Sequence, residues 1–237
     1  MPEFLKQTSK RIVLPVAVLL LFMIGLGLLI TKQLNDVWPF TVEDGINREF
    51  AGDRTGPLNA ISEIFSLLGS TPVIIGFTAI AAAVLRIKRG RWREPLFLCA
   101  AVCAQAIVFF FTTLVIDRQR PKVAHLDSSP PTSSFPSGHT SAAVALYCGL
   151  AVVFFVLAQH TWAKWLAVAF VLIPIGVAVA RLYRGMHHPT DVTSSFLNGI
   201  ACLIIMARSI LNRAVAWTVP HLRSKPGSGT KRLRTAA

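Results

Sequence analysis

Charged side chains are scarce in this sequence, and acidic ones are the scarcest. Only 15% of the 237 residues are Asp, Glu, Lys or Arg, and 11 acidic residues stand against 24 basic ones. Hydrophobic residues, in contrast, make up 53% of the chain. This balance excludes a soluble globular domain of ordinary composition and is typical of a polytopic membrane protein.

Cysteine is also rare, which argues against a disulfide framework. The four cysteines are Cys99, Cys103, Cys148 and Cys202, and all of them lie inside apolar runs. Buried free thiols are the simplest interpretation of that placement. Cys99 and Cys103 are one helical turn apart, but no nearby His or Cys completes a set of metal ligands. We therefore expect no metal site and no cofactor.

The apolar residues are gathered into six runs that predict six membrane-spanning helices. The runs cover residues 12–30, 72–85, 96–116, 141–158, 165–180 and 192–211. A cleaved signal peptide is the alternative for the first run, but no small-residue cleavage site follows it, and we predict an anchor. The expected fold is an all-α, polytopic membrane helix bundle, because a lone helix satisfies its own backbone in lipid.

A further short helix is expected between the first two runs. Apolar residues recur there at helical spacing, between Pro57 and Gly69, and they are Leu58, Ile61, Ile64, Phe65 and Leu68. Polar residues, among them Ser62 and Ser66, fall on the other side. This pattern predicts an amphipathic helix that either lies on the outer membrane surface or packs against the bundle. In either position it could shape an entrance for a lipid.

The distribution of positive charge predicts the orientation of the bundle. Six spans place both termini on one side, together with the basic loop 86–93 and most of the 24 Lys and Arg residues. The positive-inside rule then puts the termini in the cytoplasm. The net charge of +13 thus favours anionic lipids at the cytoplasmic face over nucleic acid as a partner. We divide the chain into a membrane domain, 1–216, and a basic, disordered cytoplasmic tail, 217–237.

Three short polar segments carry nearly all the side chains suited to chemistry. They are residues 118–121, 136–139 and 181–191, and each borders an apolar run. Guanidinium groups bind phosphate oxygens through paired hydrogen bonds, and backbone N–H groups at a helix start add further donors. Histidine can attack phosphorus or move protons. Together the three segments indicate a phosphate-handling pocket.

These segments resemble the three signature motifs of the type 2 phosphatidic acid phosphatase family, membrane lipid phosphatases related to vanadium haloperoxidases. The family pattern is Lys-x6-Arg-Pro, then Pro-Ser-Gly-His, then Ser-Arg-x5-His-x3-Asp. The second motif is complete at 136–139, and the third lacks only its serine, which is Ala180 here. The first keeps Arg120-Pro121 but has Thr113 at the lysine position. Three motifs in the right order are a specific signal, whereas any one alone would be weak.

The resemblance implies a role for each catalytic residue. His187 would be the nucleophile that forms a phosphohistidine, and Asp191 would accept the other imidazole N–H, like the acid of a serine-protease triad. Judged from the residues alone, Asp191 or Thr190 could instead cap the last helix. His139 would protonate the leaving group and then activate the water that cleaves the intermediate. His188 is off the motif spacing and is interpreted as a pocket-wall or surface residue.

The remaining motif residues would bind the phosphate group. Arg120 and Arg181 would clamp its oxygens, while Ser137 and Gly138 would donate from the start of the fourth span. Arg118 is predicted to supply the cation that Thr113 does not. The arginines would neutralise the phosphate charge without a metal ion, and the pocket should accept vanadate.

The implied function is metal-independent hydrolysis of a phosphomonoester or pyrophosphate on a membrane lipid. The substrate would be of the polyprenyl diphosphate or phosphatidic acid class, and the site would face the outside of the cell membrane. Two alternatives stay open: a lipid phosphotransferase with the same intermediate, and a non-catalytic lipid-binding or transport relative. The near absence of ionisable residues within the spans argues against transport, and a haloperoxidase is expected to be soluble.

Overall fold

The computed structural model describes residues 8–34, 37–38, 40–128, 131–157 and 161–211, and these residues form helices and connecting loops without a strand. Six helical segments are long and apolar enough to cross a membrane: Lys10–Lys32, Thr71–Arg89, Arg93–Val115, Gly138–Phe155, Thr161–Tyr183 and Pro189–Leu211. The predicted all-α bundle of six spans is confirmed. The predicted tail, 217–237, lies outside the described residues.

The long helices are α2 (Leu14–Lys32), α5 (Thr71–Arg89), α6 (Arg93–Val115), α9 (Thr161–Tyr183) and α10 (Pro189–Met206). The fourth span is continuous through α7 (Gly138–Ala143), a π-helical turn over Val144–Cys148, and α8 (Gly149–Leu157). Short π-helical turns also precede α2 (Ser9–Val13) and follow α10 (Ala207–Leu211).

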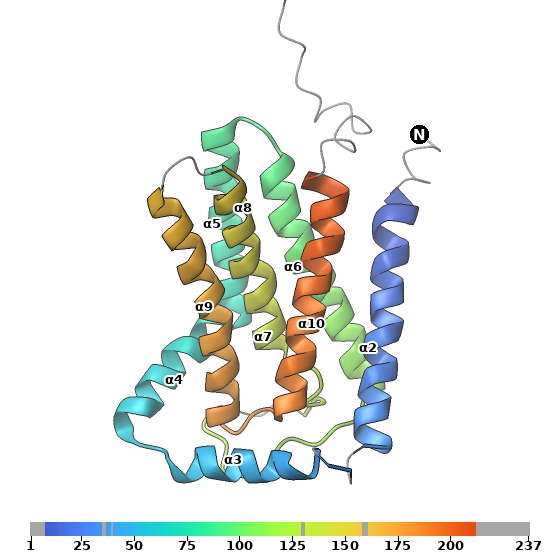
Figure 1. The fold of residues 1–237 in the computed structure, drawn as a ribbon, viewed down its shortest axis with the longest axis vertical. Helices are drawn as coiled ribbons and strands as arrows, with labels where there is room; N and C mark the ends of the chain where they lie inside the picture. The colour runs from blue at the N-terminus through green and yellow to red at the C-terminus, as the bar shows by residue number, and fades with distance from the viewer. Residues whose placement is uncertain (1–7, 35–36, 39, 129–130, 158–160, 212–237) are drawn as a thin grey trace, which may run out of the picture.

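Two shorter helices complete the described fold at one end of the bundle (Figure 1). Helix α3 (Glu43–Gly52), preceded by a 3-10 turn at Phe40–Val42, lies across that end below α9 and α10. Helix α4 (Gly56–Leu68) runs obliquely from there alongside α9. The start of α2 and the last turn of α10 lie at the opposite end. All three motif segments therefore meet at the end that α3 covers.

Several helix boundaries differ from those predicted, and two of them show the reason. The second span continues to Arg89, because Arg86, Lys88 and Arg89 occupy its last turn and Gly90, at φ +66°, terminates it. The fifth span begins at Thr161, before the predicted start at residue 165. In both places the apolar run is interrupted by a charged residue, but the helical backbone hydrogen bonds continue past it.

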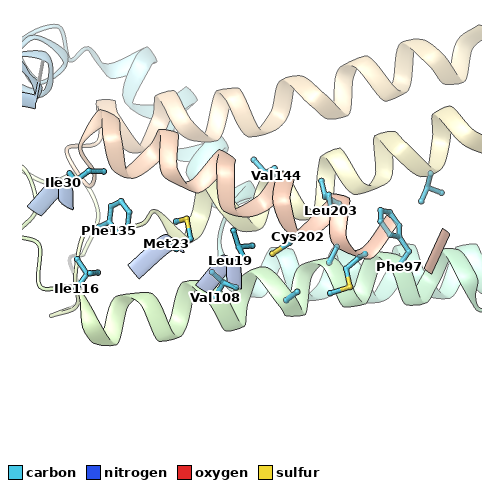
Figure 2. Close-up of a cluster of buried hydrophobic side chains, with 14 residues drawn as sticks. Leu19, Met23, Ile30, Phe97, Val108, Ile116, Phe135, Val144, Cys202 and Leu203 are labelled. Carbon is cyan, nitrogen blue, oxygen red and sulfur yellow. The ribbon is translucent and has the colours of Figure 1, made fainter. Parts of the chain in front are cut away.

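The largest buried apolar cluster joins α2, α6 and α10 (Figure 2). Met23, Phe97 and Val108 are completely buried in it. Phe135, from the loop before α7, is also completely buried, and it packs onto Gly27 of α2. A Cβ atom at Gly27 would lie 2.7 Å from the Phe135 ring. The first span is therefore fitted closely against the loop that leads into the second motif.

Helix α4 confirms the predicted amphipathic helix and shows which way it faces. Ser62 and Ser66 are buried at 6% and 7% exposure, whereas Ile61 and Ile64 are exposed at 51% and 61%. The helix packs on α9 through Phe65, whose ring would be 2.3 Å from a Cβ atom at Gly176. The serines and Phe65 therefore face the protein, whereas Ile61 and Ile64 face outward.

Candidate active site

The segment that carries His187 is placed by a tight reversal at the end of α9. Gly185 adopts φ +73°, and its N–H donates to the Leu182 carbonyl at 2.9 Å. A side chain at Gly185 would also approach the Ala124 carbonyl to 3.0 Å. Both the left-handed backbone and the lack of space require glycine here. The reversal turns the chain from α9 toward α10, so that His187 lies within electrostatic range of the buried Arg181.

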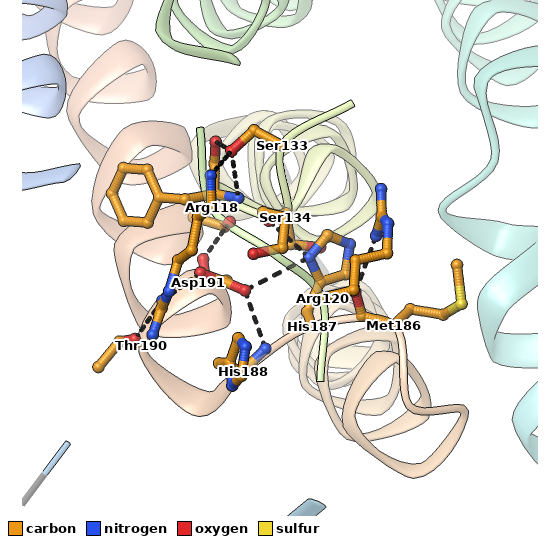
Figure 3. A network of polar contacts seen from close by, with 12 residues as sticks. Arg118, Arg120, Ser133, Ser134, Met186, His187, His188, Thr190 and Asp191 are labelled. Atoms are coloured by element: carbon orange, nitrogen blue, oxygen red, sulfur yellow. Dashed lines mark hydrogen bonds and ion pairs between the residues drawn. The ribbon is translucent and has the colours of Figure 1, made fainter. Parts of the chain in front are cut away.

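The imidazole of His187 is held in one tautomer. Its Nδ1 lies 2.7 Å from the carbonyl oxygen of Ser134 (Figure 3). A carbonyl oxygen can only accept a hydrogen bond, so Nδ1 carries the proton and Nε2 keeps its lone pair. Burial lowers the pKa of His187 to about 4, against the opposing effect of Asp191. At neutral pH the ring is therefore uncharged, with Nε2 as its nucleophilic atom.

Asp191 lies close to His187 but is not its nearest hydrogen-bond acceptor. The Asp191 carboxylate is 3.8 Å from His187 Nδ1, which is longer than a hydrogen bond. It accepts instead from the Arg118 guanidinium at 2.5 Å and from the His188 N–H at 2.9 Å. The predicted contact is thus replaced by the Ser134 carbonyl in this arrangement. Asp191 remains near enough to stabilise a positive charge on the ring.

The N-cap of α10 is neither Asp191 nor Thr190, the two residues that the sequence suggested. His188 is the N-cap, Pro189 is the first helical residue, and Asp191 is the third. The carboxylate of Asp191 accepts the His188 N–H, an arrangement that stabilises a helix start. Neither Thr190 nor Asp191 is the cap, because the helix begins at Pro189, three residues before the apolar run at 192.

Arg118 is buried between two carboxylates. One terminal nitrogen donates to Asp191 and, at 2.7 Å, to the Thr190 hydroxyl. The other donates to the Glu43 carboxylate at 2.6 Å. The prediction that Arg118 replaces the missing lysine as a phosphate ligand does not fit this geometry. Thr113 does not replace it either, since its hydroxyl donates to the Phe110 carbonyl of its own helix.

Arg120 and Arg181 keep donors that the protein leaves unused. Arg120 donates from one terminal nitrogen to the Met186 carbonyl at 2.8 Å (Figure 3). Arg181 donates to the Ser66 hydroxyl at 2.7 Å. The Nε atoms of both arginines are buried and have no hydrogen-bond partner among the residues that the structure describes. Two guanidinium groups with unused donors suit the oxygens of a phosphate group.

A carboxylate that the sequence did not single out lies next to Arg181. Asp127 binds Arg181 and Arg184, each at 2.6 Å. Burial alone would raise the pKa of Asp127, but the hydrogen bond from Arg184 and the charges of both arginines lower it overall. Arg184 also donates to Ser62. The buried serine face of α4, with its spacing of four residues, was the one sequence signal for these contacts.

The second motif lies at the start of α7. The Ser137 hydroxyl caps this helix by accepting the Thr140 N–H at 3.5 Å, so it is engaged by the protein itself. Gly138 packs against Phe109, whose ring would be 2.8 Å from an added Cβ atom. His139 lies within electrostatic range of His187, Arg120 and Arg181. The structure therefore brings together both motif histidines and both proposed phosphate clamps.

Metal ligation has no obvious location in this arrangement. Within the described ranges of the chain, no group of three or more His, Cys, Asp or Glu side chains is placed to hold a metal ion. Two of the carboxylates near His187 are engaged by arginines: Asp191 pairs with Arg118, and Asp127 pairs with Arg181 and Arg184.

Comparison with known proteins identifies the family. A sequence model of the PAP2 superfamily matches residues 94–214, about half of the chain, and this range includes all three motifs. The chain belongs to the PAP2 superfamily. Its six long apolar helices make it a multi-pass membrane member of that superfamily.

Two curated proteins are similar in sequence. The phosphatidylglycerophosphatase B of Bacillus subtilis is 23% identical over 197 residues, which cover 81% of this chain and 92% of that protein. The bacitracin transport permease protein BcrC of Bacillus licheniformis is 29% identical over 102 residues. That second alignment covers 43% of this chain and only 41% of the permease.

Two solved structures share the fold. A transmembrane PAP2-type phosphatidylglycerolphosphate phosphatase from Bacillus subtilis superimposes with a TM-score of 0.69 and 22% identity, covering 84% of this chain and 98% of that one. LpxE from Aquifex aeolicus gives a TM-score of 0.56 and 22% identity, covering 73% and 98%. At these identities the likeness establishes the PAP2 membrane fold.

Proposed function

We propose that this PAP2 protein hydrolyses a phosphomonoester or diphosphate of a membrane lipid through a phosphohistidine on His187. The observation that carries the proposal is the state of the His187 ring. It is neutral, its Nδ1–H is fixed by the Ser134 carbonyl, and its Nε2 is left as a nucleophile beside Arg120 and Arg181. A neutral, oriented imidazole next to guanidinium donors is what attack on a phosphate requires.

In the first step Nε2 of His187 forms a bond to phosphorus, and the bond to the leaving oxygen breaks. His139 donates a proton to that oxygen, while Arg120 and Arg181 stabilise the charge on the other phosphate oxygens. The ring becomes positively charged, and the nearby Asp191 carboxylate favours that charge. In the second step His139 takes a proton from water, which attacks phosphorus and releases phosphate and His187.

The proposed substrate class is a lipid with a terminal phosphate or diphosphate. The motifs suggest a polyprenyl diphosphate, phosphatidic acid or phosphatidylglycerol phosphate, and the curated Bacillus subtilis relative is named a phosphatidylglycerophosphatase. The arrangement of α4 supports a lipid. Ser66 contacts Arg181 on the inner face of this helix, while Ile61 and Ile64 are exposed on its outer face.

We further propose that the site faces outward from the cytoplasm. The loop between α5 and α6, with Arg86, Lys88, Arg89, Arg91 and Arg93 at or beside it, lies at the end of the bundle opposite α3 (Figure 1). The positive-inside rule assigns that basic end to the cytoplasm, where it would meet anionic lipids. The motif residues then lie on the extracytoplasmic side.

Phosphate release by purified, detergent-solubilised protein tests the proposed activity. The panel contains a polyprenyl diphosphate, phosphatidic acid and phosphatidylglycerol phosphate, each with EDTA present. We expect release from at least one lipid that is unchanged by EDTA and inhibited by vanadate, because the guanidinium groups supply the positive charge. No release from any of the three lipids contradicts the proposal. Transfer to an added alcohol in place of release would identify a phosphotransferase.

The pH dependence of the reaction is expected to reflect the low pKa of His187. The ring must be neutral to attack, so kcat/KM falls as pH drops through the pKa. Since this pKa is about 4, the decline attributable to His187 should occur near pH 4 and not near the ordinary value of 6.5. The check is a pH profile with two substrates whose phosphates ionise at different pH. If the decline in kcat/KM belongs to His187, it occurs at the same pH with both substrates. A decline near pH 6.5 with both substrates would show that the ring is not desolvated.

A further inference from the structure

Helix α3 contacts the catalytic segment through two buried polar side chains on one face. Glu43 and Asn47 are one helical turn apart, and they are exposed by only 5% and 0%. A short helix at the end of a bundle would ordinarily expose its polar residues, as α3 does with Arg48 and Glu49. Burial of a carboxylate and an amide therefore requires partners, and both partners lie in or beside 187–191.

Both oxygens of Glu43 are used. One accepts the backbone N–H of Thr190, in the first turn of α10, at 2.7 Å. The other accepts from Arg118 at 2.6 Å, and Arg118 donates in turn to Asp191. Glu43 thus holds the start of α10 directly and holds the Asp191 carboxylate through Arg118.

Asn47 provides a second, independent contact. Its side-chain nitrogen donates to the backbone carbonyl of His187 at 3.0 Å. The His187 ring is oriented at the same time by the Ser134 carbonyl. The backbone and the ring of His187 are therefore restrained from two different elements.

We propose that Glu43 and Asn47 are positioning residues for the reaction, and that α3 acts as a clamp on 187–191. The inference rests on the proposed phosphohistidine chemistry and assigns a function to a helix that none of the three motifs includes. Neither residue is proposed to touch the substrate. Glu43 balances Arg118 so that Asp191 stays available to the developing imidazolium, and Asn47 fixes the backbone that carries the nucleophile.

The charge balance explains why a carboxylate is needed at position 43. Arg118 lies between Glu43 and Asp191, so one cation is shared by two anions. Glu43→Gln leaves Arg118 paired with Asp191 alone, which draws the Asp191 charge away from His187. The transition state then loses stabilisation while the groups that contact substrate, Arg120 and Arg181, are unchanged. The loss is expected in kcat and not in KM.

The test uses the full chain in detergent and compares Glu43→Gln, Glu43→Asp and Asn47→Ala with the parent. Glu49→Gln is the matched control, because Glu49 is on the same helix but exposed. Since small displacements of a reacting group cost about 100-fold in rate, we expect kcat to fall by about that factor in Glu43→Gln, with KM within about twofold. Glu43→Asp retains the charge and should recover part of the rate, while Asn47→Ala should lower kcat by a smaller factor.

Hydrogen–deuterium exchange provides a readout that does not depend on activity. Amides of 187–192 should exchange faster in Glu43→Gln and Asn47→Ala than in the parent and in Glu49→Gln. Unchanged exchange, an unchanged kcat, or a loss confined to KM would each overturn the inference. If Glu43→Gln does not fold, Asn47→Ala decides, because it removes only one hydrogen bond. If the parent protein releases no phosphate, the proposed function is refuted. Hydrogen–deuterium exchange of the variants would still test the clamp in that case.

Discussion

Replacement of His187 by alanine is expected to abolish phosphate release. The variant loses the atom that forms the bond to phosphorus, and removal of a nucleophile lowers kcat by about 10⁴-fold or more. The expected result is a rate at the limit of detection with the preferred lipid. A phosphate-labelled lipid should leave acid-labile label on the parent enzyme when turnover is stopped by rapid quenching. The variant should carry no such label. Substrate binding should persist, because Arg120 and Arg181 are unchanged.

The matched control for this variant is the neighbouring histidine. His188→Asn places another good N-cap residue at the start of α10, and the backbone N–H that Asp191 accepts is retained. Its rate should stay within a few-fold of the parent. A labelled enzyme in His187→Ala, or equal losses in both variants, would show that His187 is not the nucleophile.

Replacement of Arg181 by glutamine is expected to cause the second-largest loss. Removal of one preorganised donor from a transition-state oxyanion typically costs about 100- to 1,000-fold in kcat. Arg181 is buried at 4% exposure and its Nε has no partner in the described part of the protein, so it is desolvated and available. Arg181→Lys keeps the charge but not the fork of donors, and its rate should lie between those of parent and Arg181→Gln.

Steady-state kinetics and vanadate inhibition measure this effect, because vanadate mimics the five-coordinate phosphoryl group. Vanadate should bind more weakly to Arg181→Gln by a factor similar to the loss in kcat/KM. Arg48→Gln, on the exposed side of α3, controls for the general loss of a positive charge at this end of the bundle. If Arg181→Gln turns over at the parent rate, or if vanadate affinity is unaffected, Arg181 serves only to hold Asp127 and Ser66.

The sequence predicted the features that depend on one continuous stretch of chain. Six long apolar runs are sufficient to predict six spans, because each helix satisfies its own backbone in lipid. The motif histidines and arginines are recognisable because their spacing within each motif is short and fixed. The boundaries of α5, α9 and α10 were less accurate, since charged residues and proline end an apolar run without ending the helix.

Most of the contacts that the sequence missed join distant parts of the chain. The acceptor for His187 is the backbone carbonyl of Ser134, and a backbone atom has no residue signature. Glu43 and Arg118 are 75 positions apart, and nothing in either local pattern indicates the other. Arg118 was assigned to phosphate because it is next to a motif, whereas its two carboxylate partners lie in other segments. Side-chain type suggested the chemistry, but only the packing shows which groups are left unpaired.

The close fit of Gly27 against Phe135 has a consequence for the size of the functional unit. The match to the PAP2 superfamily begins at residue 94, yet the loop before the second motif is packed against the first span. Ser66, which contacts Arg181, also precedes that boundary. The part of the molecule that matches the family model is therefore not autonomous. The N-terminal half supplies the surface on which the motif loops acquire their shape, and a minimal catalytic fragment would have to include it.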